Sequence, residues 1–170
     1  RGAFATRVLA IRPREDAAFS GVVHLELLNP STGEDFPMFW PDAGFHLMER
    51  GDAYLGITCK AVTVEHLRSR DPDRYAALRI EHDSVIWDLL GAVARATHEP
   101  EGGGLLPGLR TPTRRFATGW SQSGSFLRTY LGDRIHQQHS ALADAEIIDG
   151  YLIGVSSGGF GPMGYVELDR

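Results

Sequence analysis

Two serines and two glycines gather in the segment Gly119-Trp120-Ser121-Gln122-Ser123-Gly124. The apolar run Phe116-Ala117-Thr118 predicts a strand at about 114–118, before this segment, and apolar residues at helical spacing predict a helix after it. A serine on a sharp turn between a strand and a helix can hold its hydroxyl above the sheet and act as a nucleophile. The residues two before and two after it must be small, as Gly119 and Ser123 are. Ser121 is therefore the candidate nucleophile.

A serine that attacks a carbonyl group also needs hydrogen-bond donors for the oxyanion that forms. The backbone N–H of Gln122, at the start of the predicted helix, would supply one of them. Removing one such donor typically costs about 3 to 4 kcal/mol of transition-state stabilisation.

Three other interpretations of the segment stay open at this point. The turn can be a plain tight connection in which a serine caps the helix. The helix N-terminus can bind a phosphate group, although the segment contains neither GK[ST] nor GxGxxG. In the third interpretation the nucleophile is Ser123, and Ser121 and Ser125 flank it.

The elements that must position these residues alternate along the chain. Branched and apolar runs predict strands at 22–28, 53–59 with a continuation to 64, 114–118 and 146–156. Apolar periodicity predicts helices at 42–50, from Asp83 or Ser84 to before Pro100, and from 122 to about 136, with a polar surface excursion at 66–84 that includes a short helical turn. This order favours an α/β fold with a mostly parallel sheet and helices on both faces.

Sites in such sheets lie at the carboxyl ends of the strands. The chain has clusters of glycine, serine and other turn-forming residues after three predicted strands, at 29–33, 119–124 and 156–161. The candidate nucleophile belongs to the second of them.

Composition limits the class of protein. The 170 residues are 42% hydrophobic and suit one domain over 1–170. The net charge of −5 and the absence of a basic block argue against nucleic-acid binding.

No apolar run approaches the roughly 18 residues that cross a bilayer. The single Cys59 lies in an apolar run and is expected to be buried. Without an HExxH or paired CxxC motif, we expect no metal and no cofactor. Secreted and cytoplasmic locations are not distinguished.

Several segments also resemble a known family. The stretch "GWSQSGSFLRTYL" followed by "IIDGYLIGVSSGG" is similar to alpha/beta-hydrolase domain proteins whose nucleophile elbow reads Gly-x-Ser-Gln-Ser. The resemblance covers the chain from Phe19 to Gly159, through the earlier segments "FSGVVHLELLNPS", "GDAYLGITCKAV" and "DPDRYAALRIEHDSVIWDLLGAV". The Gly-x-Ser-Gln opening is also similar to cutinases. The resemblance implies a serine hydrolase that cleaves a small-molecule carboxylic ester through an acyl-enzyme on Ser121.

The resemblance further implies that a second oxyanion donor comes from the loop after an early strand. That loop matches Leu28-Asn29-Pro30-Ser31 in this sequence. Pro30 has no N–H. Asn29 or Ser31 is therefore expected to supply the second donor.

The general base and its orienting acid are harder to place. In this fold an acid and then a histidine follow the serine along the chain. The histidines after Ser121 are His136 and His139, which on a straight helix would lie roughly 22 to 27 Å from it. The other five precede the serine: His24, His46, His66, His82 and His98. The later acids Asp149, Glu167 and Asp169 do not clearly follow a strand.

We therefore expect the acid and the base to come from a segment outside 1–170 or from a second chain that completes the domain. A parallel sheet without its last strands would expose an apolar edge. The alternative is a hydrolase-like binding or interaction module without a working triad.

Overall fold

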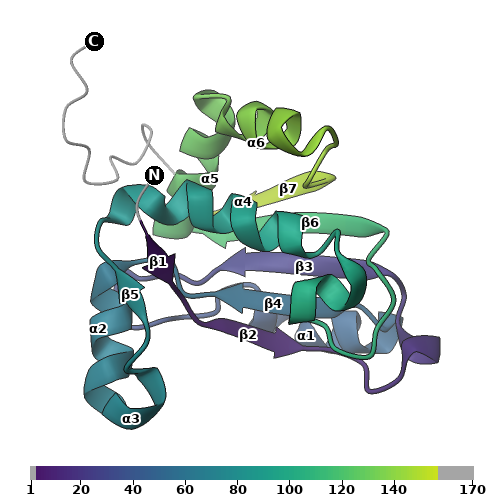
Figure 1. Cartoon of the computed structure of the whole chain (residues 1–170), viewed down its shortest axis with the longest axis horizontal. Helices are drawn as coiled ribbons and strands as arrows, with labels where there is room; N and C mark the ends of the chain where they lie inside the picture. Colours follow the sequence, from purple (N-terminus) through teal and green to yellow (C-terminus); the bar gives the residue numbers. More distant parts are fainter. Residues whose placement is uncertain (1–2, 157–170) are drawn as a thin grey trace.

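The computed structural model describes residues 3–156, which form a five-stranded sheet covered by helices. Neighbouring strands in the sheet are β2 (Val8–Ile11), β4 (Ala53–Ile57), β3 (Val22–Leu27), β6 (Arg114–Trp120) and β7 (Gly150–Gly154), in this order from bottom to top of Figure 1. Four of them are parallel, and β2 pairs antiparallel with β4 at one edge. The expected α/β class with a mostly parallel sheet is confirmed.

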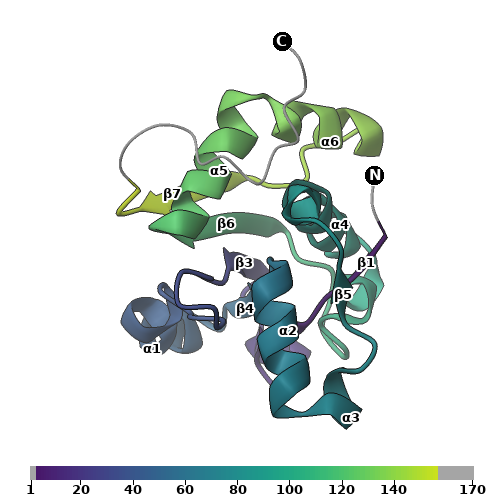
Figure 2. The same ribbon diagram turned by 90° about the vertical axis from the view of Figure 1, so that its left-hand side faces the viewer.

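Helices lie on both faces of this sheet. Helix α1 (Trp40–Arg50) covers one face and α4 (Ile86–Ala96) the other, with the strands between them in Figure 2. Helix α5 (Gln122–Gly132) packs beside α4, where the indole N–H of Trp87 donates to the carbonyl of Phe126 at 3.1 Å. Among residues 3–156, no helix is both long and apolar enough to cross a membrane.

The remaining elements are short or peripheral. Helix α6 packs against α4 and α5, and α2 contacts α3 and the small sheet formed by β1 and β5. Their bounds are β1 (Phe4–Ala5), α2 (Ala61–Arg70), α3 (Pro72–Tyr75), β5 (Arg79–Ile80) and α6 (Ile135–Ala143), with 3-10 turns at Asp16–Ala18, Asp83–Val85 and Pro100–Gly104.

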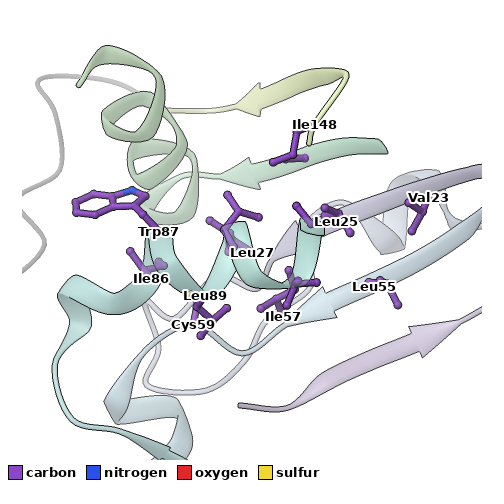
Figure 3. Packing of buried hydrophobic residues seen from close by; sticks show 14 of the residues in the cluster. Val23, Leu25, Leu27, Leu55, Ile57, Cys59, Ile86, Trp87, Leu89 and Ile148 are labelled. Carbon is purple, nitrogen blue, oxygen red and sulfur yellow. The ribbon is translucent and has the colours of Figure 1, made fainter. Parts of the chain in front are cut away.

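Alternation along the strands divides their side chains between the two faces. Val23, Leu25 and Leu27 of β3 are fully buried in the core against α4, together with Leu55 and Ile57 of β4 (Figure 3). The core residues that α4 contributes recur at helical spacing, which is why its sequence pattern predicted a helix: Ile86, Trp87, Leu89, Leu90, Val93 and Ala94.

Cys59 follows β4 and belongs to the same core. Its side chain is fully buried, as expected from the sequence, and its thiol donates to the carbonyl of Leu28 at 3.4 Å. Burial raises the pKa of this thiol well above its ordinary value.

A buried acid stabilises the other face of the sheet. Glu26 of β3 accepts the N–H groups of Met38 and Phe39 at 2.7 and 2.8 Å, just before α1. The hydroxyl of Tyr54 donates to its second oxygen at 2.6 Å. Burial raises the pKa of Glu26 above its ordinary value of 4.5, and these hydrogen bonds offset the rise only in part.

This raised pKa makes the free energy of unfolding depend on pH. The folded protein binds the Glu26 proton more tightly than the unfolded chain does, so its stabilising contribution is complete below the unfolded pKa and is lost as the pH rises through the folded one. We expect wild type to lose stability relative to Glu26→Gln as the pH rises above the ordinary value of 4.5 toward the raised pKa of the folded protein. Urea unfolding of both proteins across this range measures the difference, and parallel profiles would contradict the prediction.

The predicted strand at 53–64 is correct in its first half and wrong in its second. The strand ends at Ile57 and α2 begins at Ala61, within the continuation that the apolar residues suggested. The reason is Asp83, which accepts the N–H of Ala61 at 3.1 Å and pairs with Lys60 at 3.0 Å. Asp83 therefore caps α2 and not α4, whose N-terminus has no side-chain cap.

The predicted helix from 122 to about 136 is also wrong in its length. Helix α5 ends at Gly132, and Arg134 adopts the left-handed conformation with φ 58° and ψ 25°. The chain turns there, and α6 packs against α4 and α5. In the same region the predicted strand at 146–156 is shortened to β7.

Candidate active site

Ser121 connects β6 to α5 in an unusual backbone conformation. Its φ is 54° and its ψ is −118°, whereas Glu101, Arg134 and Asp144 combine positive φ with ψ of 25° to 31°, the ordinary left-handed region. Sparsely populated conformations cost about 1–3 kcal/mol and persist where the surrounding structure enforces them. The side chain of Ser121 is exposed and makes no capping hydrogen bond to α5. The interpretation of Ser121 as a helix cap is therefore not supported.

Three elements fix the backbone on both sides of this serine. Its N–H donates to the carbonyl of Gly154 in β7 at 3.0 Å, and its carbonyl accepts the N–H of Ser125 in α5 at 3.0 Å. The side-chain amide of Asn29, after β3, donates to the carbonyl of Trp120 at 2.7 Å.

Small residues are required on both sides of the turn because its backbone segments nearly touch. A Cβ at Gly119 would lie 2.6 Å from the carbonyl oxygen of Ser123. A Cβ at Gly124 would lie 3.0 Å from the carbonyl oxygens of both Gly119 and Gly154. The size pattern in the sequence thus has a direct steric cause.

Ser123 does not have the surroundings of a nucleophile. It is 0% exposed. Its hydroxyl accepts the N–H of Trp120 at 3.0 Å and donates to the carbonyl of the same residue at 3.1 Å. Ser123 therefore closes the turn, and the interpretation that makes it the nucleophile is not supported.

The expected oxyanion donors differ in their availability. Gln122 is the first residue of α5, so its N–H has no acceptor within the helix. The N–H of Asn29 instead donates to the carbonyl of Phe36 at 2.9 Å, and the N–H of Ser31 donates to the side chain of Asn29 at 2.9 Å. The hydroxyl of Ser31 lies beside the helix start, 3.3 Å from the side-chain oxygen of Gln122.

All seven histidines of the sequence lie within residues 3–156, where none is hydrogen-bonded to Ser121. His139 is buried, with its Nδ1 3.0 Å from the hydroxyl of Tyr130, and His136 has its Nδ1 3.4 Å from the carbonyl of the same residue. His24 pairs with Asp52 at 3.0 Å, near the amino end of β3.

Of the three later acids, the structure describes Asp149, which does not approach the serine turn at 119–124 either. Asp149 precedes β7, where it accepts the N–H of Arg115 at 2.8 Å and pairs with Arg114 at 2.9 Å. These contacts lie at the amino end of β6, opposite the end that carries Ser121. Glu167 and Asp169 lie outside the described residues, as does most of the predicted cluster at 156–161. Within 3–156, no three His, Cys, Asp or Glu side chains are grouped so that they could hold a metal.

A family model described as alpha/beta hydrolase domain matches residues 1–169. The chain belongs to the alpha/beta hydrolase family. Among solved structures, this alpha/beta hydrolase is similar to a serine hydrolase without a lid from Xanthomonas campestris, with 16% identity and a TM-score of 0.43. The match covers 84% of this chain and 57% of the other, so the chain spans little more than half of that protein's length. A comparison with curated proteins finds no match.

In this alpha/beta hydrolase, the side chain of Asn29 has a structural role that the sequence pattern did not predict. The sequence predicted a backbone N–H from Asn29 or Ser31, whereas the structure uses the side-chain amide of Asn29 to join the loop after β3 to the serine turn. The available signal was its placement: Asn29 is the only asparagine in the sequence, and it stands two residues after the end of a central strand.

Proposed function

We propose that this alpha/beta hydrolase cleaves a carboxylic ester through an acyl-enzyme on Ser121. The observation that carries the proposal is the conformation of Ser121. Its hydroxyl is exposed at the start of α5, on a turn that β7, α5 and Asn29 hold in a costly backbone conformation. Strain of this kind is concentrated at functional sites because it orients reactive groups.

The chemistry would proceed in two steps. In the first, Ser121 Oγ attacks the ester carbonyl and gives its proton to a base, and the tetrahedral intermediate collapses with loss of the alcohol. In the second, water attacks the acyl-enzyme and releases the acid and the free serine. The N–H of Gln122 and the hydroxyl of Ser31, on the two sides of this site, are the proposed donors to the oxyanion.

Among residues 3–156, no described hydrogen bond joins a histidine to Ser121, and His24, His136 and His139 contact other groups instead. We propose that the histidine and its acid come from a segment outside this sequence or from a second chain. The substrate pocket would include residues of that segment, so the acyl and alcohol groups of the ester are left general in this proposal.

Labelling with a fluorophosphonate tests the proposal directly. An activated serine attacks phosphorus and displaces fluoride, which leaves a stable adduct whose mass is known. We expect intact mass spectrometry of the natural protein to show one adduct, and peptide mapping to place it on Ser121. A folded natural protein that stays unlabelled at Ser121 would overturn the proposed function.

A second candidate function is a binding or interaction module with the same fold. The observation in its favour is that no histidine of residues 3–156 is hydrogen-bonded to Ser121. Such a module would not react with the probe, and its ligand binding would survive Ser121→Ala. The labelling experiment therefore separates the two candidates.

A further inference from the structure

We infer that Asn29 is a positioning residue, whose side-chain amide fixes the peptide that precedes the nucleophile and couples it to the loop that carries the oxyanion donor. The inference rests on the proposed function and adds a role that neither the family match nor the sequence pattern assigns. It depends on the two ends of one amide group. The Nδ2 of Asn29 donates to the carbonyl of Trp120 at 2.7 Å, and its Oδ1 accepts the N–H of Ser31 at 2.9 Å.

The bond to Trp120 acts on the peptide group that determines the direction of Ser121. Both polar atoms of that peptide are held: its carbonyl by Asn29, and its N–H by the carbonyl of Gly154 at 3.0 Å. The plane of this peptide sets φ of Ser121, which is 54°. A change in the plane would therefore change where the serine hydroxyl points.

Asn29 is itself rigidly placed, as a positioning group must be. It is 5% exposed. Its backbone N–H donates to the carbonyl of Phe36 at 2.9 Å, and its own carbonyl accepts the N–H of Phe36 at 3.0 Å. These backbone bonds do not involve the side chain, so the backbone of Asn29 should keep its place when the side chain is changed.

The carbonyl of Trp120 also accepts a hydrogen bond from Ser123 Oγ at 3.1 Å. Loss of the Asn29 donor would therefore leave this carbonyl with a partner. For this reason we expect a moderate loss of reactivity and no collapse of the turn.

Asn29→Asp is the most direct test, because it keeps the shape and the acceptor for the N–H of Ser31 but replaces the donor to Trp120 with a carboxylate oxygen. We expect fluorophosphonate labelling of Ser121 in the natural protein to slow by about tenfold, the size of one lost hydrogen bond. With p-nitrophenyl butyrate as the probe ester, kcat should fall by about the same factor and KM should stay unchanged.

The matched control is Asp35→Asn, in the same loop. Asp35 pairs with Arg7 at 2.8 Å and accepts the hydroxyl of Thr58, but has no contact with the serine turn among the described hydrogen bonds. The Asp35→Asn substitution should lower the thermal midpoint and leave the labelling rate of the folded protein within about twofold of wild type. Asn29→Ser, which removes both bonds without adding charge, is the second variant and should slow labelling at least as much as Asn29→Asp.

The outcomes are distinct. Slow labelling in both Asn29 variants with a normal rate in Asp35→Asn supports the positioning role. Wild-type labelling rates in folded Asn29 variants, or equal losses in all three variants, would overturn it. Failure of the wild-type protein to label would overturn the proposed function, and this inference with it.

Discussion

Replacing Ser121 with alanine is expected to lower kcat for ester cleavage by about 10⁴- to 10⁶-fold, the range found when a serine nucleophile is removed. Fluorophosphonate labelling should disappear at the same time. The loss would be chemical and not structural, because the side chain of Ser121 is exposed and makes no capping bond to α5. The thermal midpoint of Ser121→Ala should therefore match that of wild type, measured by circular dichroism beside the kinetics.

Ser123→Ala is the matched control, because it removes a hydroxyl two residues away that is buried and hydrogen-bonded to Trp120 at both its N–H and its carbonyl. We expect it to lose about 1 kcal/mol of stability, the usual contribution of a hydrogen bond, and to remain labelled at Ser121. Labelling that persists in Ser121→Ala and vanishes in Ser123→Ala would assign the nucleophile to Ser123 instead.

Gly119→Ala should have the largest effect on stability. The added Cβ would lie 2.6 Å from the carbonyl oxygen and 2.8 Å from the carbonyl carbon of Ser123, and neither backbone atom can move without shifting α5. We expect a loss of about 3 kcal/mol in the free energy of unfolding, at the upper end of what overpacking costs. Ester cleavage should fall further than the folded fraction does, because the shift moves the start of α5 with Ser121.

Gly150→Ala, in the neighbouring strand, provides the comparison. Its Cβ would meet the ring of Phe116 at 3.1 Å, and this half-buried side chain can adjust by a few tenths of an ångström, unlike a backbone atom. Urea unfolding and probe labelling of both variants measure the contrast. Equal stability of Gly119→Ala and wild type would show that the turn is less tightly packed than the structure describes.

The fold was predictable from sequence wherever burial alone decides the structure. Strand β3 and helix α4 carry continuous or periodic apolar residues, and both lie where the pattern placed them. Prediction failed where one polar contact competes with the pattern. Asp83 caps α2 from a distance of 22 residues, and the left-handed Arg134 ends a helix whose apolar spacing continues past it. The edge strand β2 was not predicted either, because it forms by pairing with β4, which lies more than 40 residues further along the chain.

The candidate site shows the same division. The position of Ser121 between a strand and a helix, and the need for small neighbours, follow from local sequence, and the structure supplies their geometry. The second oxyanion donor was not predictable, because the hydrogen bonds of Asn29 and Ser31 depend on Phe36 and Trp120, which meet them only in the folded chain. The role of Ser121 itself stays a prediction until the labelling experiment is done.

The burial of Cys59 determines when its thiol can react with reagents in solution. The only thiol of the sequence sits in the core at the end of β4, with its pKa raised and its proton shared with the carbonyl of Leu28. Oxidants and electrophiles react with an accessible thiolate, so we expect Cys59 to be unreactive while the protein is folded. Covalent modification of Cys59 would therefore require at least local unfolding around Leu28, next to the loop that contains Asn29. A modified Cys59 would thus report that the protein had unfolded there.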